Sequence, residues 1–375
     1  MSKRKIWAFL VLCNSQSGLL FPCRRPFDTI AGVKALLLSH YNRLEIVDVP
    51  MPRPGPDEIL VRVHACGICG SDVHGYDGST GRRLPPIIMG HEAAGTVAAV
   101  GATASQFRQG DRVTFDSTIY CGRCDYCRRG EVNLCDNRQV LGVSTPDFRR
   151  EGAFAEYVVV PERLTYKLGE SVPFEHAAMI EPLAVAVHAV SLTKVDESTT
   201  AVVFGAGMIG LLVLQVLREK KCPRIYVVDL DDTRLQLAKH LGATATINAK
   251  TSDTLSDLQR LTEGASIDVA FEAVGSTPTI ANAIKAVRKG GAIVLIGNVA
   301  PTIELPLQAV VSKQLTLHGS AASSGEYPEC IELLRRAAVK LEPLITAVAS
   351  LEEGPGWFDR LHAREPNLMK VILKP

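Results

Sequence analysis

Four cysteines within fifteen residues form the densest group of reactive side chains in this 375-residue sequence. The segment CGRCDYCRRGEVNLC has the spacing C-x2-C-x2-C-x7-C and supplies Cys121, Cys124, Cys127 and Cys135. Four thiolates fill the tetrahedral shell of zinc, so a zinc ion here would be closed to substrate and structural. An iron–sulfur cluster is the alternative, because bacterial ferredoxins begin with the same spacing. They continue with three residues and Cys-Pro, whereas seven residues separate the last two cysteines here, which favours structural zinc.

A second set of metal ligands is incomplete, and it is therefore the better candidate for chemistry. Cys69 lies in HACGICGSDVH, and His91 and Glu92 lie in GHEAAG. One thiolate, one imidazole and one carboxylate leave a coordination position for substrate, which is typical of catalytic zinc. Glu181, in MIEP, adds a carboxylate where the first half of the chain runs into the second, and a buried carboxylate needs a cation or a proton role. A lone cysteine or histidine is more often a packed side chain, but the combination predicts an open metal site.

A glycine-rich segment, VVFGAGMIG, predicts a dinucleotide site. It follows a predicted strand and opens a predicted helix, the context in which G-x-G-x-x-G binds a pyrophosphate. The first glycine permits a tight turn, the second lets the backbone approach the phosphates, and the third allows close contact between helix and strand. The unpaired N–H groups at the start of the helix face the phosphates. The predicted cofactor-binding residues of the turn are Gly205, Gly207, Met208, Ile209 and Gly210.

Asp229 lies 24 residues beyond Gly205, at the end of the next predicted strand. A carboxylate there can accept both ribose hydroxyls and would repel a 2′-phosphate. The sequence therefore favours NAD over NADP, although Arg234 is close enough to accommodate a phosphate. A solvated turn acid is the alternative for Asp229, since Asp231 and Asp232 follow it.

Two different sequence patterns along the chain indicate which strands and helices position these residues. From about 34 to 170, short β-branched runs alternate with Gly/Pro turns, which predicts a β-barrel-like or sandwich domain. From about 185 to 320, strands alternate with helices, and apolar runs without alternation predict parallel strands buried on both faces. The expected strands are 200–204, 224–230, 244–248, 267–274, 292–297 and 315–320, and the expected helices are 208–220, 232–241, 253–262 and 278–288. A helix at 328–339 and a strand at 370–373 are expected to return to the first domain.

Composition and the N-terminus exclude several classes of protein. Lys and Arg number 41 and Asp and Glu 40, so the basic excess of a nucleic-acid binder is absent. No apolar run approaches the roughly 20 residues that span a bilayer. Residues 1–32 imitate a signal peptide, but no A-x-A-like site follows their apolar run, and we expect them to lie outside the fold. A chain this long does not need disulfides, so its ten cysteines favour a reducing, cytoplasmic compartment.

Together these motifs resemble the zinc-dependent medium-chain dehydrogenases, and within them the polyol and sorbitol dehydrogenase branch. The segments that carry the resemblance are GICGSDVH, GHEAAGTV, the four-cysteine segment, IEPLAVAVHA, VVFGAGMIG and VVDL. The resemblance covers nearly the whole chain after residue 33. It implies an α/β fold with a GroES-like β-rich catalytic domain at 33–184, a structural-zinc lobe at about 115–140, a Rossmann NAD-binding domain at 185–322 and a C-terminal return at 323–375. It also implies a homo-oligomer, either a dimer or a tetramer.

The resemblance further implies residue roles and a reaction. Cys69, His91 and Glu92 look like the catalytic zinc ligands, and Glu181 would hold the zinc-bound water or exchange with a ligand. Ser71 matches the hydroxyl that begins a proton relay, and His74 matches a second polar group near the substrate. Liver-type alcohol dehydrogenases carry cysteine where this branch has the glutamate, which argues against simple primary alcohols. The implied reaction transfers a hydride between NAD and a secondary alcohol of a polyol, sugar alcohol or sugar phosphate.

Alternatives stay open at this stage. L-threonine 3-dehydrogenase and butanediol dehydrogenase share much of the pattern, although the threonine branch usually has Thr in place of Ser71. Some animal sorbitol dehydrogenases lack the four-cysteine lobe that this chain keeps. A zinc- and nucleotide-binding redox sensor on the same fold is the non-enzymatic alternative, but a sensor needs neither an open ligand set nor a relay hydroxyl. Arg82 and Arg83, in GSTGRRLPP, could bind a sugar phosphate, and a solvated basic turn is the competing interpretation.

Overall fold

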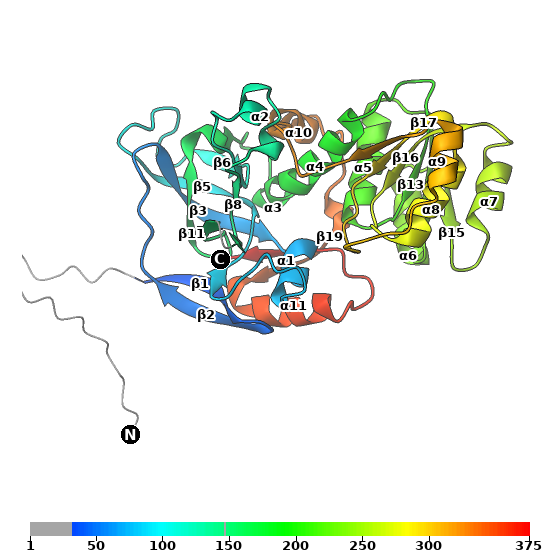
Figure 1. Cartoon of the computed structure of the whole chain (residues 1–375). Helices are drawn as coiled ribbons and strands as arrows, with labels where there is room; N and C mark the ends of the chain where they lie inside the picture. The colour runs from blue at the N-terminus through cyan, green and yellow to red at the C-terminus, as the bar shows by residue number, and fades with distance from the viewer. Residues whose placement is uncertain (1–31, 146–147) are drawn as a thin grey trace, which may run out of the picture. The chain divides into compact units, whose positions relative to one another are not determined.

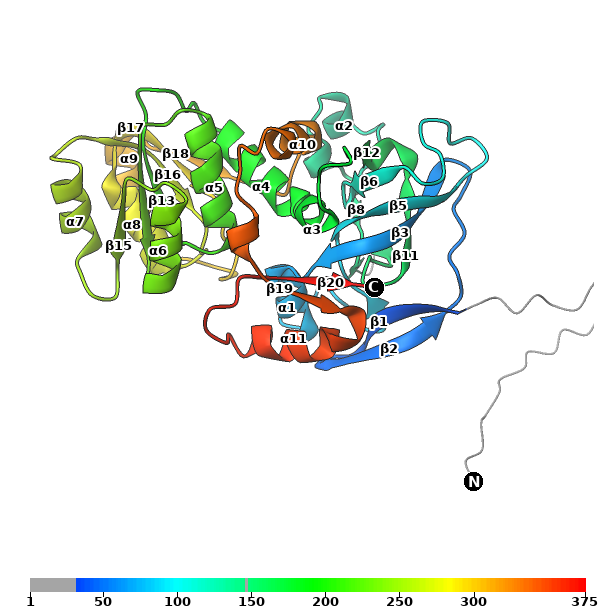
Figure 2. The same cartoon turned by 180° about the vertical axis from the view of Figure 1, so that it is seen from behind.

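The computed structural model describes residues 32–145 and 148–375. The expectation that residues 1–32 lie outside the fold concerns a segment that, apart from Gly32, is not among these described residues. Gly32–Pro375 forms one compact unit. It contains a β-rich portion built from both ends of the chain and an α/β portion built from its middle, labelled in Figure 1 and seen from behind in Figure 2.

The β-rich portion is organised around a seven-stranded sheet with the order β12-β6-β5-β3-β20-β19, in which β11 also pairs with β3. Its strands are β3 (Glu58–Gly67), β5 (Glu92–Val100), β6 (Arg112–Phe115), β11 (Tyr157–Pro161), β12 (Thr165–Lys167), β19 (Ile345–Ser350) and β20 (Lys370–Lys374). Smaller sheets are β2-β1-β4, made of β1 (Val33–His40), β2 (Arg43–Val49) and β4 (Ile87–Ile88), then β7 (Thr118–Ile119) with β8 (Gln139–Val140), and β9 (Val143–Thr145) with β10 (Phe148–Arg150).

The register of β3 brings distant segments together at one end of this sheet. Gly67, the last residue of β3, lies opposite Glu92 on β5 and opposite Ile372 on β20. A Cβ atom on Gly67 would lie 2.2 Å from the Glu92 carboxylate, so only glycine leaves room for that side chain. The first residues of β5, the last strand of the chain and the segment after β3 therefore meet in one place.

Short helices accompany this portion. They are α1 (Gly70–Tyr76), α2 (Asp125–Arg128), α3 (Phe174–Ala178), α10 (Tyr327–Arg335) and α11 (Gly354–His362), with 3-10 turns at Val132–Leu134, Glu162–Leu164, Glu342–Leu344 and Leu351–Glu353. The helix expected at 328–339 ends earlier, at Arg335, and Ala337 in the following turn has a positive φ of 52° that a helix does not permit.

The middle of the chain forms a six-stranded parallel sheet with the order β15-β14-β13-β16-β17-β18. Its strands are β13 (Thr200–Phe204), β14 (Arg224–Asp229), β15 (Ala245–Asn248), β16 (Ile267–Glu272), β17 (Val287–Leu295) and β18 (Thr316–Gly319), and its helices are α4 (Ile180–Ser191), α5 (Met208–Glu219), α6 (Asp232–His240), α7 (Thr254–Leu261), α8 (Thr277–Ala286) and α9 (Leu307–Lys313). This order is that of the doubly wound dinucleotide fold. The predicted α/β fold class is therefore confirmed.

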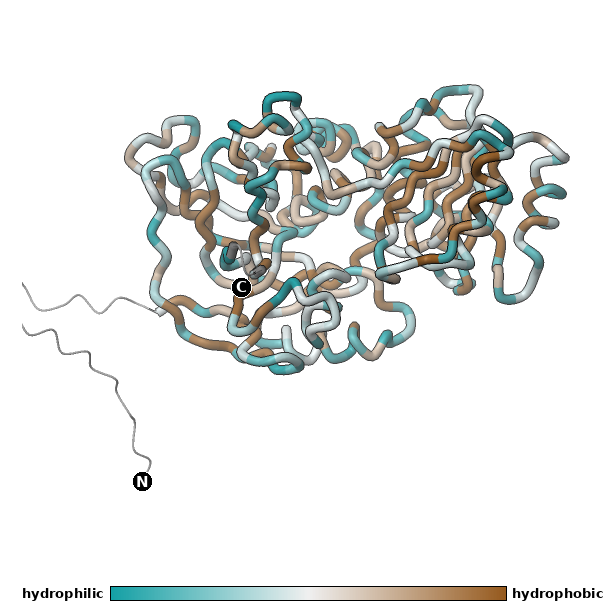
Figure 3. The backbone as a smooth tube through the Cα atoms, in the orientation of Figure 1, coloured by the Kyte–Doolittle hydropathy of each residue, from teal (hydrophilic) through white to brown (hydrophobic). Residues whose placement is uncertain are grey.

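Most residues of the central strands of this sheet are apolar, and Figure 3 shows these strands largely in brown. All five residues of β13 are buried, as the absence of alternation predicted. The fifth strand begins at Val287 rather than at 292, because Val287 pairs with Ile267 before a register shift that accommodates the polar turn RKGG. The domain boundaries that the sequence suggested stay a prediction. Among the described residues, no helix is long and apolar enough to cross a membrane.

Candidate active site

Cys69 connects β3 to α1 and is fixed by local hydrogen bonds. It is the N-cap residue of α1, and its sulfur accepts the Ser71 N–H at 3.5 Å. The Asp72 carboxylate accepts the Cys69 N–H at 3.3 Å in return. This reciprocal pair is a capping box with cysteine in the usual place of serine or threonine. The sulfur is thereby held where the chain turns from the sheet into the helix.

His91 and Glu92 reach the same place from the start of β5. Both side chains are buried, with 6% and 1% of their residues' surfaces exposed. One ligand atom each from Cys69, His91 and Glu92 lies within 4.8 Å of the others. The structure thus brings together the three predicted zinc ligands, although Cys69 lies more than twenty residues before the other two in the chain.

Lys370 also belongs to this site, although no motif in the sequence pointed to it. Its ammonium group, 4% exposed, lies 2.8 and 2.6 Å from the two Glu92 oxygens and donates to the carbonyl oxygen of Ile68 at 3.0 Å. Burial alone would lower the pKa of Lys370, but the negative charge of Glu92 outweighs it and the pKa is raised. The ion pair with Lys370 fixes the orientation of the Glu92 carboxylate from the last strand of the chain.

The imidazole of His91 lies between two anionic groups. Its Nδ1 atom is 3.4 Å from Asp72 Oδ1, within ion-pair range, but the arrangement is not that of a hydrogen bond. Burial would lower the pKa of His91, yet Asp72 and Cys69 raise it well above its ordinary value. Metal binding uses the neutral imidazole, and the same neighbours that favour a positive charge on His91 would also favour a metal cation bound to its ring.

Glu181 is the second residue of α4 and is half-buried. Desolvation raises the pKa of Glu181 to about 7, and the neighbouring Glu92 charge acts in the same direction while His91 opposes it. Glu181 therefore lies within electrostatic range of the ligands but is not part of the compact three-ligand group. The donor set of sulfur, imidazole and carboxylate, with a further carboxylate nearby, fits zinc.

The two predicted relay residues are both on α1. Ser71 is exposed, and its hydroxyl oxygen accepts a hydrogen bond from the Arg83 guanidinium at 3.1 Å. His74 is half-buried, and its carbonyl oxygen accepts the Ser79 hydroxyl at 2.8 Å. Of the two arginines, Arg82 is exposed, as a solvated basic turn requires, whereas Arg83 is buried. The sequence alone could not show that one of these adjacent arginines is exposed and the other buried.

The four cysteines of the lobe converge on a separate point. Their sulfurs lie within 4.8 Å of one another. Backbone N–H groups of Arg123 and Cys124 lower the pKa of Cys121 to about 6, while burial and the adjacent Cys124 thiol raise the pKa of Cys127 to about 12. Four sulfurs this close cannot all be thiolates without a cation between them. The group therefore fits a closed tetrahedral zinc site.

The glycine-rich turn lies between β13 and α5, as predicted. Gly205 has a φ of +100°, and a Cβ atom on Gly210 would lie 1.8 Å from the Gly205 carbonyl oxygen. A Cβ atom on Gly207 would have no neighbour within 4 Å, so this position leaves space for a ligand to approach the backbone. Met208 and Ile209 form the first residues of α5.

Asp229 ends β14 beside this turn. One carboxylate oxygen accepts the Ala206 N–H at 2.6 Å, and the other accepts the N–H groups of Leu230 and Asp231 at 2.7 and 3.0 Å. The carboxylate therefore connects the second strand to the glycine-rich turn rather than extending into solvent. Arg234 is half-buried in the first turn of α6.

Glu272 is a further buried acid that the sequence did not reveal. It ends β16, is fully buried, and accepts the Val274 and Gly275 N–H groups at 3.1 and 2.9 Å. A Cβ atom on Gly275 would lie 2.5 Å from the backbone of Gly297, and one on Gly205 would lie 2.8 Å from the Val274 side chain. Glu272 thus fixes the loop after β16 against the glycine-rich turn and the end of β17.

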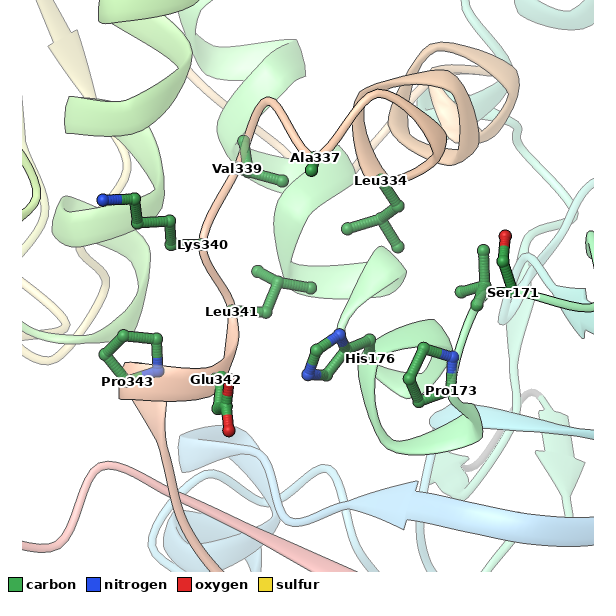
Figure 4. A pocket seen from close by; sticks show the side chains of 11 residues that line it. Ser171, Pro173, His176, Leu334, Ala337, Val339, Lys340, Leu341, Glu342 and Pro343 are labelled. Atoms are coloured by element: carbon green, nitrogen blue, oxygen red, sulfur yellow. The ribbon is translucent and has the colours of Figure 1, made fainter.

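A pocket of about 430 Å³ lies away from these residues. Figure 4 shows its lining, which includes His176 on α3 and Leu341 and Glu342 in the segment after α10. None of the predicted metal or cofactor residues lines it. We therefore assign it no part in the chemistry.

Asp116, which precedes the first of the four cysteines, gives a prediction about stability. It is 3% exposed, and burial raises the pKa of Asp116 to about 7, although its carboxylate accepts the Thr118 N–H at 2.8 Å. The unfolded chain releases this proton near pH 4 and the folded chain near pH 7, so the folded state binds more protons in between. Stability should therefore fall as pH rises through this window, by roughly 2 to 4 kcal/mol from this group.

Asp116→Asn should remove that contribution. We expect the variant to be more stable, relative to the unsubstituted protein, at pH 8 than at pH 5. Urea titration at both pH values measures this as a larger gain in the free energy of unfolding at pH 8. Asp57→Asn, at an exposed position, is the control for the loss of a charge. An equal difference at the two pH values for Asp116→Asn would contradict the prediction.

Comparison with known proteins identifies the class to which this site belongs. Residues 55–170 match the family described as alcohol dehydrogenase GroES-like domain, and residues 209–336 match the family described as zinc-binding dehydrogenase. The sorbitol dehydrogenase of Bacillus subtilis (strain 168) is 33% identical over 349 residues, covering 92% of this chain and 98% of that protein. The chain therefore belongs to the zinc-containing alcohol dehydrogenase family and is an oxidoreductase, which confirms the resemblance of its motifs.

Two solved structures agree with this assignment. An alcohol dehydrogenase from Escherichia coli CFT073, complexed with NADH, has a TM-score of 0.85 and 31% identity, covering 92% of this chain and 100% of that one. A protein from Sinorhizobium meliloti 1021, bound to NADP, has a TM-score of 0.84 and 30% identity over 92% of this chain and 100% of that one. Similar chains thus bind either nicotinamide cofactor.

Proposed function

We propose that this protein oxidises a secondary alcohol of a polyol, sugar alcohol or sugar phosphate with NAD. The observation that carries the proposal is the convergence of the half-buried Cys69 with the buried His91 and Glu92, within electrostatic range of Glu181. The B. subtilis relative is a sorbitol dehydrogenase. A second zinc, held by the four cysteines of the lobe, would be structural, and the reducing conditions these thiolates require agree with a cytoplasmic location.

Different residues of the chain would bind the metal and transfer the proton. Cys69, His91 and Glu92 would hold a zinc ion, which when bound supplies a Lewis acid that lowers the pKa of an alcohol. Glu181 lies close enough to hold a proton or orient a polar ligand beside these three. Ser71, on the exposed face of α1, would accept the proton of the substrate hydroxyl and pass its own proton on, with His74 about one helical turn away on the same short helix. NAD would supply the hydride acceptor.

The preference for NAD follows from Asp229, whose carboxylate would accept the ribose hydroxyls and repel a 2′-phosphate. Asp229→Asn removes the charge but keeps an acceptor oxygen. We expect the dissociation constant for NADH to rise about tenfold, because a hydrogen bond to a charged group contributes about 1.5–3 kcal/mol. We also expect the ratio of the NADPH to the NADH dissociation constant to fall by more than tenfold, because the repulsion of the 2′-phosphate is lost as well. Fluorescence titration with both cofactors measures this.

Asp232→Asn is the matched control, because Asp232 is an exposed acid in the first turn of α6. It should leave both dissociation constants within about twofold of their original values. An unchanged NADH-to-NADPH ratio in Asp229→Asn would show that selection lies elsewhere, with Arg234 the next residue to test.

The substrate proposal is tested with a panel of polyols, polyol phosphates, butanediol and L-threonine, assayed by NADH absorbance with zinc content measured on the same protein. Turnover of a polyol or its phosphate at a kcat/KM at least tenfold above the other classes is the expected result. Preference for L-threonine or butanediol would move the protein to one of those activities. Cofactor binding without turnover of any alcohol would favour the zinc- and nucleotide-binding sensor instead.

We also propose that the protein is a homo-oligomer. Strand β18 forms an edge of the parallel sheet, and the preceding segment exposes Leu305, Leu307 and Val311, which are 40%, 63% and 69% exposed. An uncovered strand edge beside exposed apolar side chains is a common subunit contact. Light scattering coupled to gel filtration should give a dimer or tetramer, and a monomer at micromolar concentration would contradict this.

A further inference from the structure

The second arginine of GSTGRRLPP is buried at the active site. Arg83 is 4% exposed, and its Nη2 atom donates to Ser71 Oγ at 3.1 Å and to Asp72 Oδ1 at 2.9 Å. Its Nε atom is also buried and has no hydrogen-bond partner among the described residues. A guanidinium is not placed in a protein interior without a structural or chemical role, because removing it from water is costly.

The backbone on both sides of Arg83 is fixed by one buried serine of β9. The Ser144 hydroxyl accepts the Leu84 N–H at 2.7 Å and donates to the Leu84 carbonyl oxygen at 3.1 Å. The Ser144 N–H donates to the Arg82 carbonyl oxygen at 3.1 Å. The loop therefore enters the site in a defined register, and the direction of the Arg83 side chain does not depend on a solvated turn.

The stem of Arg83 passes over α1 at a residue without a side chain. A Cβ atom on Gly75 would lie 2.7 Å from Cγ of Arg83 and 3.0 and 3.1 Å from Cδ and Cβ. These atoms are the near end of the side chain, so they cannot move aside without moving the guanidinium. Gly75 thus permits the close approach of Arg83 to the helix that carries Ser71 and Asp72.

The contacts have a direction that matters for proton transfer. Arginine has N–H donors and no acceptor, so Ser71 must accept in the bond between them. One lone pair of the Ser71 oxygen is then occupied, the other is free to accept a proton from a substrate hydroxyl, and the serine's own proton is free to be passed on. The same Nη2 atom holds the Asp72 oxygen that lies 3.4 Å from His91 Nδ1. One cation therefore touches both the relay hydroxyl and the carboxylate behind a metal ligand.

We propose that Arg83 is a positioning residue that fixes the Ser71 hydroxyl for proton transfer and, through Asp72, the orientation of His91. The proposal rests on the proposed dehydrogenase function for its Ser71 part, while the His91 part concerns metal binding alone. Arg83 itself does not touch substrate or metal in this account. For Arg83, this positioning role takes the place of the two interpretations suggested by the sequence, a sugar-phosphate contact and a solvated basic turn.

The test compares Arg83→Met, Arg83→Lys and the matched control Arg82→Met, which changes the exposed neighbour. For Arg83→Met we expect kcat to fall about 10- to 100-fold with KM for NAD within twofold, and the solvent deuterium isotope effect on kcat to increase because proton transfer becomes slower. We expect zinc affinity at the exchangeable site, measured by chelator competition, to fall about tenfold. Arg83→Lys should recover part of kcat, and Arg82→Met should match the unsubstituted protein.

Gly75→Ala supplies a second variant that keeps the charge and displaces the arginine. It should reproduce the fall in kcat and the larger isotope effect, and because the added Cβ overpacks a buried site, its melting temperature should fall by a few degrees. The proposal is overturned if folded Arg83→Met keeps kcat, isotope effect and zinc affinity unchanged, or if it loses only thermal stability. If the unsubstituted protein oxidises no alcohol, the dehydrogenase proposal fails, and chelator competition still decides whether Arg83 supports the metal ligand.

Discussion

Cys69→Ser is expected to lower kcat for alcohol oxidation by at least about 10³-fold while leaving the dissociation constant for NAD within about threefold. The Cys69 sulfur is one of three ligand atoms within 4.8 Å of one another, and a serine hydroxyl is a far weaker ligand for zinc. The cofactor turn at Gly205–Gly210 lies on a different sheet, so its contacts with NAD do not depend on the sulfur.

The comparison for this variant is Cys66→Ala. Cys66 is fully buried on β3, and burial raises the pKa of its thiol well above the ordinary value, so it is a packed side chain rather than a ligand. Its removal should cost about 1 kcal/mol of stability and little activity. Equal loss of turnover in the two variants, or loss of NAD binding together with turnover in Cys69→Ser, would contradict separate metal and cofactor sites.

Cys124→Ser is expected to have the opposite profile, with a large loss of stability and release of one zinc per chain. Four sulfurs within 4.8 Å hold the lobe together, and a structural zinc contributes its binding energy directly to folding. We expect the free energy of unfolding to fall by several kcal/mol and the melting temperature by about 10 °C. Calorimetry and metal analysis of the same sample measure both quantities.

The two cysteine variants serve as controls for each other. Cys69→Ser should also lose one zinc but keep its melting temperature within a few degrees, whereas Cys124→Ser should lose stability first. If the protein is brown, with an absorption band near 400 nm, the four cysteines hold an iron–sulfur cluster and not a structural zinc. Equal melting temperatures for Cys124→Ser and the unsubstituted protein would show that the lobe does not depend on a metal.

Spacing rules predicted those parts of the molecule in which the interacting residues are close in sequence or share a repeating element. The four-cysteine lobe needs only fifteen residues to bring its ligands together. The parallel sheet follows from strand–helix alternation, because crossovers between parallel strands have one hand and leave few possible orders. Cys69, His91 and Glu92 could be named because each lies in a local motif, and the antiparallel register of β3 and β5 then brings them together.

The site residues that could not be predicted from the sequence make contacts with residues far away in the chain. Such contacts produce no motif or repeating pattern around the residue itself. Lys370 meets Glu92 across 278 residues, because β20 returns to the side of β3. Arg83 and Arg82 are neighbours of one type, and which of them is buried depends on distant contacts such as the Ser144 hydrogen bonds and the Asp72 carboxylate. Glu272 ends a strand in a position where an acid usually meets solvent, and its burial depends on the packing of three separate loops.

The central claim is that Cys69, His91 and Glu92 hold a zinc ion on which alcohol oxidation depends. The most direct test is to remove the exchangeable metal, confirm by metal analysis that the zinc of the four-cysteine lobe remains, and titrate zinc back while following NADH formation with the best polyol of the panel. We predict negligible activity at the start and a linear recovery that is complete at one equivalent of added zinc per chain. Full activity before zinc is added would contradict it.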